Sequence, residues 1–333
     1  MTSREIVKRN ITFSDPPRIA IKFDVFGFND CYDIWLKDCR GYTFETGGID
    51  EWGCVWERSE VDNMGRITRY PLSDWSEFSA YQFPDPLSPA KYVQFAQDLA
   101  GAGDKFVMFC GGHGLFERFH LLRGFENALL DVYVEPEKTH ELLDGLLDFH
   151  MRVITEVHRL GGGRLDAVAI ADDWGTESAT MISPEKFREF WKPRYAKLFK
   201  HIHDLGMHTW MHSCGKINDV VDDLIDAGLD VVNSQQPRTV GIDEFGRRFA
   251  GRICFETIVD TQTTYPHGTL DEIRDEAREL VQKWNTPHGG FIASDYNDAA
   301  AIGTTIERRR AAFEAFAELA GIDPSLYPVP EGS

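Results

Sequence analysis

His212 and Cys214 form a His-x-Cys pair, the sharpest group of metal-binding side chains in this sequence of 333 residues. Imidazole nitrogen and thiolate sulfur are both common ligands of Zn²⁺. The pair ends an apolar stretch that predicts a β-strand over 207–212, and alternation along a strand gives residues two apart the same facing. The sequence therefore predicts that His212 and Cys214 bind zinc at the end of this strand.

The remaining zinc ligands must come from other segments. Cys254 lies in a later predicted strand, 252–257, and is the predicted third metal ligand. Glu256 has the same facing by alternation and is an alternative. A buried free Cys that only packs is equally common, so that interpretation of Cys254 stays open. Further candidates for the open positions are Glu177, Asp295 and Tyr296.

Acidic residues follow another apolar strand, predicted over 165–171. Asp172 and Asp173 are adjacent, so only one of them is expected to point inward. We predict Asp173 and Glu177 as catalytic groups, because a buried carboxyl with a raised pKa can act as a general acid or base. Helix capping is the alternative role for these acids.

Polar side chains also occur at the ends of the other predicted strands. A site assembled from many strand ends would use them to hold a substrate. The residues predicted to bind substrate on this ground are His113, Asn233, Gln235 and Tyr296.

A strand–turn–helix unit repeats from about residue 100 and would position all of these groups. The predicted strands cover 105–110, 165–171, 207–212, 229–233, 252–257 and 289–293, and amphipathic helical patterns separate them. Alternating strands and helices imply parallel strands joined by crossovers. We predict an α/β fold, a single (β/α)8 TIM barrel whose active site lies at the carboxyl ends of the strands, with an open doubly wound sheet as the alternative.

The first 90 residues have a different character, rich in aromatic residues, Gly and Pro. We interpret 1–90 as an N-terminal strand and a cap segment over one mouth of the barrel formed by 91–333, all within one domain. Long irregular segments in compact domains are often functional. An aromatic pocket under the cap is one interpretation of these residues, and a small core of the cap itself is the other.

Charge and composition exclude several classes of function. The formal net charge is −19, and no Lys/Arg cluster suggests a nucleic-acid partner. No apolar run reaches the ~20 residues needed to cross a bilayer, and the charged N-terminus does not resemble a secretory signal, so we expect a cytoplasmic protein. The sequence contains no phosphate-binding GxxxxGK[ST], GxSxG or HExxH motif.

From about residue 15 to residue 320 the chain resembles the uroporphyrinogen decarboxylase superfamily, and within it the cobalamin-dependent methyltransferase and aryl methyl ether O-demethylase branch. The resemblance is carried by GLFERFHLLRGFENALLDVYVEPE (114–137), ADDWGTESATMISPEKFREFWKPRY (171–195), MHSCGKINDVVDDLIDAGLDVVNSQQP (211–237) and DTQTTYPHGTLDEI (260–273). The Arg-rich N-terminal signature of true uroporphyrinogen decarboxylases is replaced by PPRIAIKFDVFGFNDCYD, which has too few arginines to bind a polycarboxylate porphyrinogen.

The resemblance implies a zinc-dependent methyltransferase. His212 and Cys214 match the zinc-binding His-x-Cys of the branch, and Cys214 and Cys254 have the spacing of two Cys in the zinc pattern of aryl demethylases. Tyr296 stands where many relatives have a further ligand. The implied reaction moves a methyl group from a methoxylated aromatic to the Co(I) of cobalamin carried by a separate corrinoid protein. The alternatives are a lyase of the same fold that decarboxylates another small acid, and a binding protein without catalysis.

Overall fold

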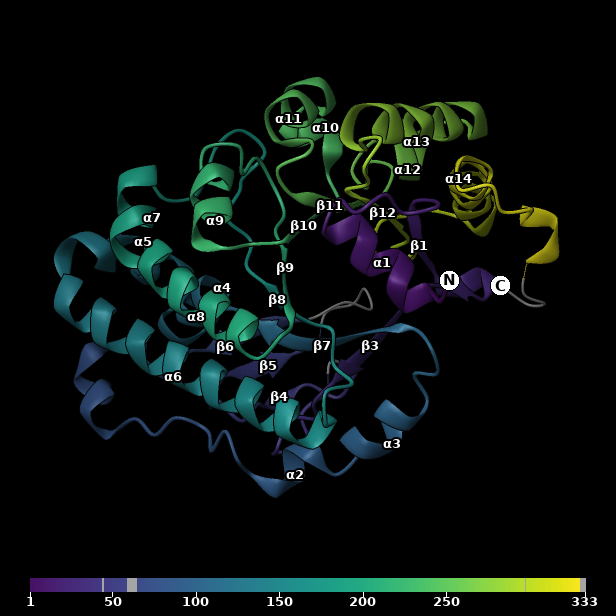
Figure 1. Ribbon diagram of the computed structural model, residues 1–333. Helices are drawn as coiled ribbons and strands as arrows, with labels where there is room; N and C mark the ends of the chain where they lie inside the picture. Colours follow the sequence, from purple (N-terminus) through teal and green to yellow (C-terminus); the bar gives the residue numbers. More distant parts are fainter. Residues whose placement is uncertain (44, 59–64, 297, 330–333) are drawn as a thin grey trace.

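The computed structural model describes residues 1–43, 45–58, 65–296 and 298–329. Within these ranges eight parallel strands form a nearly closed barrel in the order β1-β12-β11-β10-β9-β8-β7-β3 (Figure 1). The strands are β1 (Ala20–Phe23), β3 (Cys31–Trp35), β7 (Phe106–His113), β8 (Ala167–Ala171), β9 (His208–His212), β10 (Val231–Ser234), β11 (Cys254–Thr257) and β12 (Phe291–Ser294). The predicted TIM-barrel fold is confirmed, including all six strands expected between residues 105 and 293.

The barrel closes between β1 and β3. The short strand β2 (Phe28–Asn29) runs antiparallel beside β1, and the Asp30 backbone N–H donates to the Ile21 carbonyl at 2.8 Å. The Asp30 carboxylate in turn accepts from the Ile21 N–H at 2.9 Å. This local link replaces the regular ladder found between the other barrel strands.

Helices cover the outside of the barrel, and a large apolar core fills the space between the two layers. The helices that follow β7 to β9 are α4 (Leu115–Arg123), α5 (Phe125–Val134), α6 (Pro136–Gly161), α7 (Pro184–Phe190), α8 (Lys192–Asp204) and α9 (Val221–Ala227). Those that follow β10 to β12 are α10 (Pro237–Val240), α11 (Ile242–Phe249), α12 (Thr264–His267), α13 (Leu270–Trp284) and α14 (Ile306–Leu319), with a final 3-10 turn η3 (Pro324–Leu326).

A second apolar cluster fills the lower half of the barrel interior, which is the half nearer the amino-terminal ends of the strands. Alternation along β7 places Phe106, Met108 and Cys110 inside, while Val107 and Phe109 pack against the outer helices. Helix α1 (Ser3–Ile11) closes the amino-terminal end of the barrel, with its apolar side chains in the same interior cluster. The chemistry of the molecule must therefore lie at the opposite, carboxyl end of the strands.

The segment between β3 and β7 forms the cap. It contains a three-stranded antiparallel sheet, two short helices and a 3-10 turn. These elements are β4 (Gly48–Ile49), β5 (Val55–Glu57), β6 (Arg66–Arg69), η2 (Trp75–Ala80), α2 (Pro89–Tyr92) and α3 (Phe95–Ala100). The first 90 residues thus supply two barrel strands and helix α1 besides the cap, more than the single strand expected. Another 3-10 turn, η1 (Asp24–Phe26), follows β1. No helix in the described ranges is long and apolar enough to cross a membrane.

Candidate metal centre

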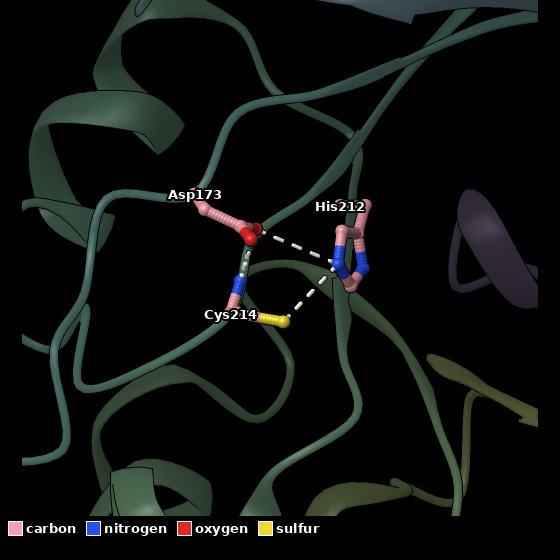
Figure 2. Close-up of side chains that lie close together, drawn as sticks. All are labelled: Asp173, His212 and Cys214. Carbon is pink, nitrogen blue, oxygen red and sulfur yellow. Dashed lines mark hydrogen bonds and ion pairs between the residues drawn. The ribbon is translucent and has the colours of Figure 1, made fainter. Parts of the chain in front are cut away.

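Asp173, His212 and Cys214 lie together at the carboxyl ends of β8 and β9 (Figure 2). The His212 Nε2 atom is 3.4 Å from Cys214 Sγ and 3.5 Å from Asp173 Oδ1. One ligand atom from each residue lies within 4.8 Å of the other two, and no other group of three or more potential ligands is this close within the described residues. The structure therefore brings together both residues of the predicted His-x-Cys pair and adds a carboxylate.

Asn233 at the end of β10 holds the His212 ring. The two strands are in register at these positions, and His212 Nδ1 is 2.5 Å from the Asn233 side-chain oxygen. An amide oxygen only accepts, so Nδ1 carries the proton and donates it. That leaves Nε2 unprotonated and directed at Asp173 and Cys214, the arrangement that metal-binding His residues generally have.

Two glycines allow the loops after β8 and β9 to cross in direct contact. The Gly175 N–H donates to the Cys214 carbonyl at 3.1 Å, and the Lys216 N–H donates to the Thr176 carbonyl at 2.7 Å. A Cβ on Gly215 would lie 2.1 Å from the Gly175 carbonyl oxygen, and Gly215 also has a φ of +77°. Only glycine readily adopts this positive φ and also leaves room for the Gly175 carbonyl. The crossing of the two loops fixes the backbone of Cys214.

The chemistry of the donor set fits Zn²⁺. An imidazole nitrogen, a sulfur and a carboxylate oxygen are the three zinc-binding groups of proteins, and a site with three protein ligands leaves a position for a substrate. Burial raises the pKa of the Cys214 thiol, and the Asp173 charge raises it further. A divalent cation bound here would lower the pKa of the Cys214 thiol, because it favours the thiolate and neutralises the charge of the Asp173 carboxylate.

The neighbouring acids Asp172 and Asp173 have different surroundings, as alternation predicts. Asp173 accepts a hydrogen bond of 2.7 Å from the Cys214 N–H and lines a cavity. Asp172 is fully buried and accepts from the N–H groups of Leu115 and Glu117 at the start of α4. Asp172 therefore anchors a helix, whereas Asp173 faces the ligand space.

Glu117 is a residue that the sequence reasoning missed. It lies in the first turn of α4, lines the same cavity as Cys214, and shares a 2.8 Å hydrogen bond with His113 Nδ1. Burial, followed by the Asp173 charge, raises the pKa of Glu117 to about 8, while burial and Arg118 lower the pKa of His113 to about 3. The usable signal was its position four residues after His113, on the helix that leaves a strand end.

The predicted Cys254 lies apart from His212 and Cys214. Its facing is inward, but it starts β11 and is in register with Val231, one layer deeper than His212. It is fully buried in the apolar cluster of the lower barrel. The same cluster contains Trp210, which is also in register with Val231.

The other candidate acids also have surroundings of their own. Glu177 is exposed in the loop after β8. Glu256 pairs with Lys22 at 3.1 Å and accepts from the Trp210 indole N–H at 2.7 Å. Asp295 accepts from the Arg309 guanidinium and from the Tyr265 hydroxyl.

A cavity of about 1000 Å³ extends from the barrel interior to the cap. His113, His212, Asn233, Gln235 and Tyr296 line it, so three strand ends besides that of His212, those of β7, β10 and β12, contribute to its wall. A smaller cavity shares His113, His212, Gln235 and Tyr296 with it and is also lined by Cys214 and Asp173. Of the three candidate ligands, His212 thus faces the larger space, which is large enough for a small organic molecule.

Residues 62–316 match the model of the family described as Uroporphyrinogen decarboxylase (URO-D). The chain belongs to this family. It is similar to the Methylcobamide:CoM methyltransferase MtaA of Methanosarcina barkeri, with 28% identity over 118 residues, 35% of this chain and 33% of the relative. It is also similar to the Methylated-thiol–coenzyme M methyltransferase of Methanosarcina mazei, with 23% identity over 197 residues, 59% of this chain and 49% of the relative.

The URO-D chain therefore matches between a third and a half of the length of these curated relatives. Among solved structures, a methyltransferase from Methanosarcina mazei superposes with a TM-score of 0.64 and 19% identity, over 89% of this chain and 82% of that one. This likeness shows a common fold.

Proposed function

We propose that this URO-D family member is a zinc-dependent methyltransferase that moves a methyl group from a small methoxylated aromatic to the Co(I) of a separate corrinoid protein. The observation that carries the proposal is the Asp173–His212–Cys214 group at the carboxyl ends of the barrel strands. Support comes from the relatives, whose names describe methyl transfer involving a methylcobamide, coenzyme M or methylated thiols.

In this proposal His212 and Cys214 are zinc ligands and Asp173 takes the third position. Bound there, Zn²⁺ would supply Lewis-acid polarisation of the ether oxygen of the donor. Asn233 keeps His212 in the tautomer that presents Nε2. His113, Gln235 and Tyr296 line the adjoining space and would contact the donor.

Glu117 is the group we propose to hold the proton that the phenolic oxygen takes up when its bond to the methyl carbon breaks. In the metal-free chain burial raises its pKa to about 8, so the carboxyl holds its proton at neutral pH. His113 fixes its carboxyl by a hydrogen bond of 2.8 Å. An acid held in this way is poised near the working pH, where proton transfer is most effective.

Metal analysis tests the zinc assignment directly. Protein purified after expression with ample zinc should contain about one zinc per chain, and His212→Ala and Cys214→Ala should lose it. Anaerobic incubation with a reduced corrinoid protein and a panel of methoxybenzoates should then yield the methylated corrinoid and the phenol. Wild-type protein that stays metal-free would overturn the zinc assignment.

The decarboxylating lyase is distinguished by the same assay. It would release carbon dioxide from a small acid with no corrinoid protein present and would not need His212 or Cys214. Methyl transfer that disappears in both variants, without any release of carbon dioxide, excludes it.

A further inference from the structure

Arg118 is a buried cation with most of its hydrogen-bonding capacity unused. It lies on α4, is 9% exposed and lines the large cavity. Its one ion pair within the described residues is with Asp50, at 3.5 Å from Nη1, and neither Nε nor Nη1 has a hydrogen-bond partner there. A guanidinium offers five N–H donors, and leaving them unpaired in a buried place is unfavourable.

The Asp50 carboxylate is already occupied by neutral donors of the cap. It accepts from the backbone N–H groups of Trp52 and Cys54 and from the indole N–H of Trp56, at 2.8 to 3.0 Å. Nε and Nη1 of Arg118 are therefore left buried without a hydrogen bond in the described residues, on a residue that lines the cavity. A carboxylate matches a guanidinium with two parallel hydrogen bonds.

His150 on α6 is a second unpartnered group on the same cavity. It is 5% exposed, and its Nε2 atom has no hydrogen-bond partner in the part of the chain that the structure describes. Burial, with the Arg118 charge second, lowers the pKa of His150 to about 3. The ring is therefore neutral, and its Nε2 tautomer can donate a hydrogen bond without adding charge.

Aromatic rings stand beside these two groups. The Arg118 guanidinium lies 4.7 Å from the centre of the Trp52 ring, and Trp52 packs edge-on against Phe149 at 4.6 Å. Trp52, Phe149 and His150 all line the cavity. An aromatic ring bound here would have apolar walls, with donors at one end.

Three further acids of the cavity wall pair with cations. Glu51 pairs with Lys91, and Glu256 pairs with Lys22. Asp295 is held by Arg309. Among the cations of these pairs, Arg118 is the one whose Nε and Nη1 have no hydrogen-bond partner in the described residues.

We propose that Arg118 and His150 form a binding site for the carboxylate of an aromatic acid, and that the methyl donor is therefore a methoxylated aryl carboxylate. This inference rests on the proposed function for the methoxy group alone. The carboxylate site stands on the geometry of α4, α6 and the cap.

Calorimetric titration of the full chain with matched ligands tests the site without any corrinoid protein. The probes are para-methoxybenzoate and meta-methoxybenzoate, each compared with its carboxamide, and methoxyacetate as an acid without a ring. Titrations are run on zinc-loaded and on chelated protein. Wild type should bind one or both benzoates at least about tenfold more tightly than the matched amide, because a charged hydrogen-bonded pair is replaced by a neutral one.

Variants show which residues cause the preference for the benzoates over the matched amides. Arg118→Gln should abolish it, Arg118→Lys should keep only part of it, and His150→Phe should weaken benzoate binding several-fold. Lys37→Gln is the matched control, since Lys37 lines the same cavity but is exposed, and it should keep the preference. The comparison of acid with amide in wild type needs no variant, so misfolding of Arg118→Gln would not decide the test.

Equal binding of acids and amides, absence of any binding, or a preference that survives in Arg118→Gln overturns the carboxylate site. Methoxyacetate binding as tightly as the benzoates overturns the aromatic part. If methyl transfer fails while the benzoate preference holds, the proposed function is wrong and this site stands. If methyl transfer succeeds on neutral anisoles and the protein binds acids and amides equally, the proposed function stands and the carboxylate site is wrong.

Discussion

Asn233 controls which nitrogen of His212 faces the candidate metal. Asn233→Ala removes the acceptor of the Nδ1 proton, so the ring can rotate or adopt the other tautomer. We expect zinc affinity to fall by about 10- to 100-fold, the usual effect of removing such a partner. Competition with a chromophoric chelator measures it. Gln235→Ala is the control, since Gln235 lines the cavity; equal losses in the two variants would contradict the assignment.

Glu117 gives the metal-free protein a pH-dependent stability. Glu titrates near about 4.3 in an unfolded chain, whereas burial raises the pKa of Glu117 to about 8 in the folded protein. The unfolded chain thus loses this proton first, and stability decreases as the pH rises between those two values and stays low above the folded pKa. Gln cannot ionise, so Glu117→Gln escapes this decrease.

The expected result is a melting temperature of Glu117→Gln that rises relative to wild type from about pH 5 to about pH 8. Differential scanning calorimetry with a chelator present measures it. Glu177→Gln, at an exposed position in the loop after β8, should parallel wild type. A constant difference between Glu117→Gln and wild type at all pH values would show that Glu117 is not the buried acid described here.

At the scale of elements, the crossing of the β8 and β9 loops positions the metal ligands. Gly215→Ala should displace the Cys214 backbone and lower zinc affinity at least tenfold, because its Cβ would overlap the Gly175 carbonyl. Gly206→Ala is the matched control: its φ of +76° nearly equals the +77° of Gly215, but a Cβ there has no atom within 4 Å. It should cost about 1 kcal/mol of stability and leave zinc binding unchanged. Similar zinc affinities in the two variants would refute the role of the crossing.

Some elements of the fold could be predicted from the sequence and others could not. Strands β7 to β12 are continuous apolar runs between helices, and such runs are recognisable. Strand β3 contains Asp33, and α1 is dominated by charged residues, so neither has a clear apolar pattern. Alternation gives the facing of Cys254 but not its depth along the barrel axis. Depth depends on register, which links strands distant in sequence.

The same limit applies to the site. His212, Cys214 and Asp173 were each predicted to have a functional role, because polar residues at strand ends meet at one mouth of a barrel. Their grouping depends on the contact between Gly175 and Gly215, which involves two loops. Arg118 was not predicted either, since its lack of partners is a property of the cap and α6 packing around it.

At the scale of the whole molecule, zinc binding should appear as stability of the entire barrel. A ligand that binds only the folded chain adds about 2.7 kcal/mol when its concentration is a hundredfold above Kd. Because the ligands come from β8 and β9 in the middle of a cooperative barrel, the whole unfolding transition should move, by a few degrees. A chelator should reverse the shift, and His212→Ala should not respond to zinc at all.

Cys254→Ala completes this experiment, because it separates the two cysteines that the sequence pairs by spacing. If Asp173 is the third ligand, Cys254→Ala lowers the melting temperature slightly by removing a buried group but responds to zinc as wild type does. Cys214→Ala, in contrast, loses the response. A zinc response that disappears in Cys254→Ala would mean that the barrel interior rearranges to bring β11 to the metal. The Asp173 assignment would then have to be abandoned in favour of the ligand pair suggested by spacing.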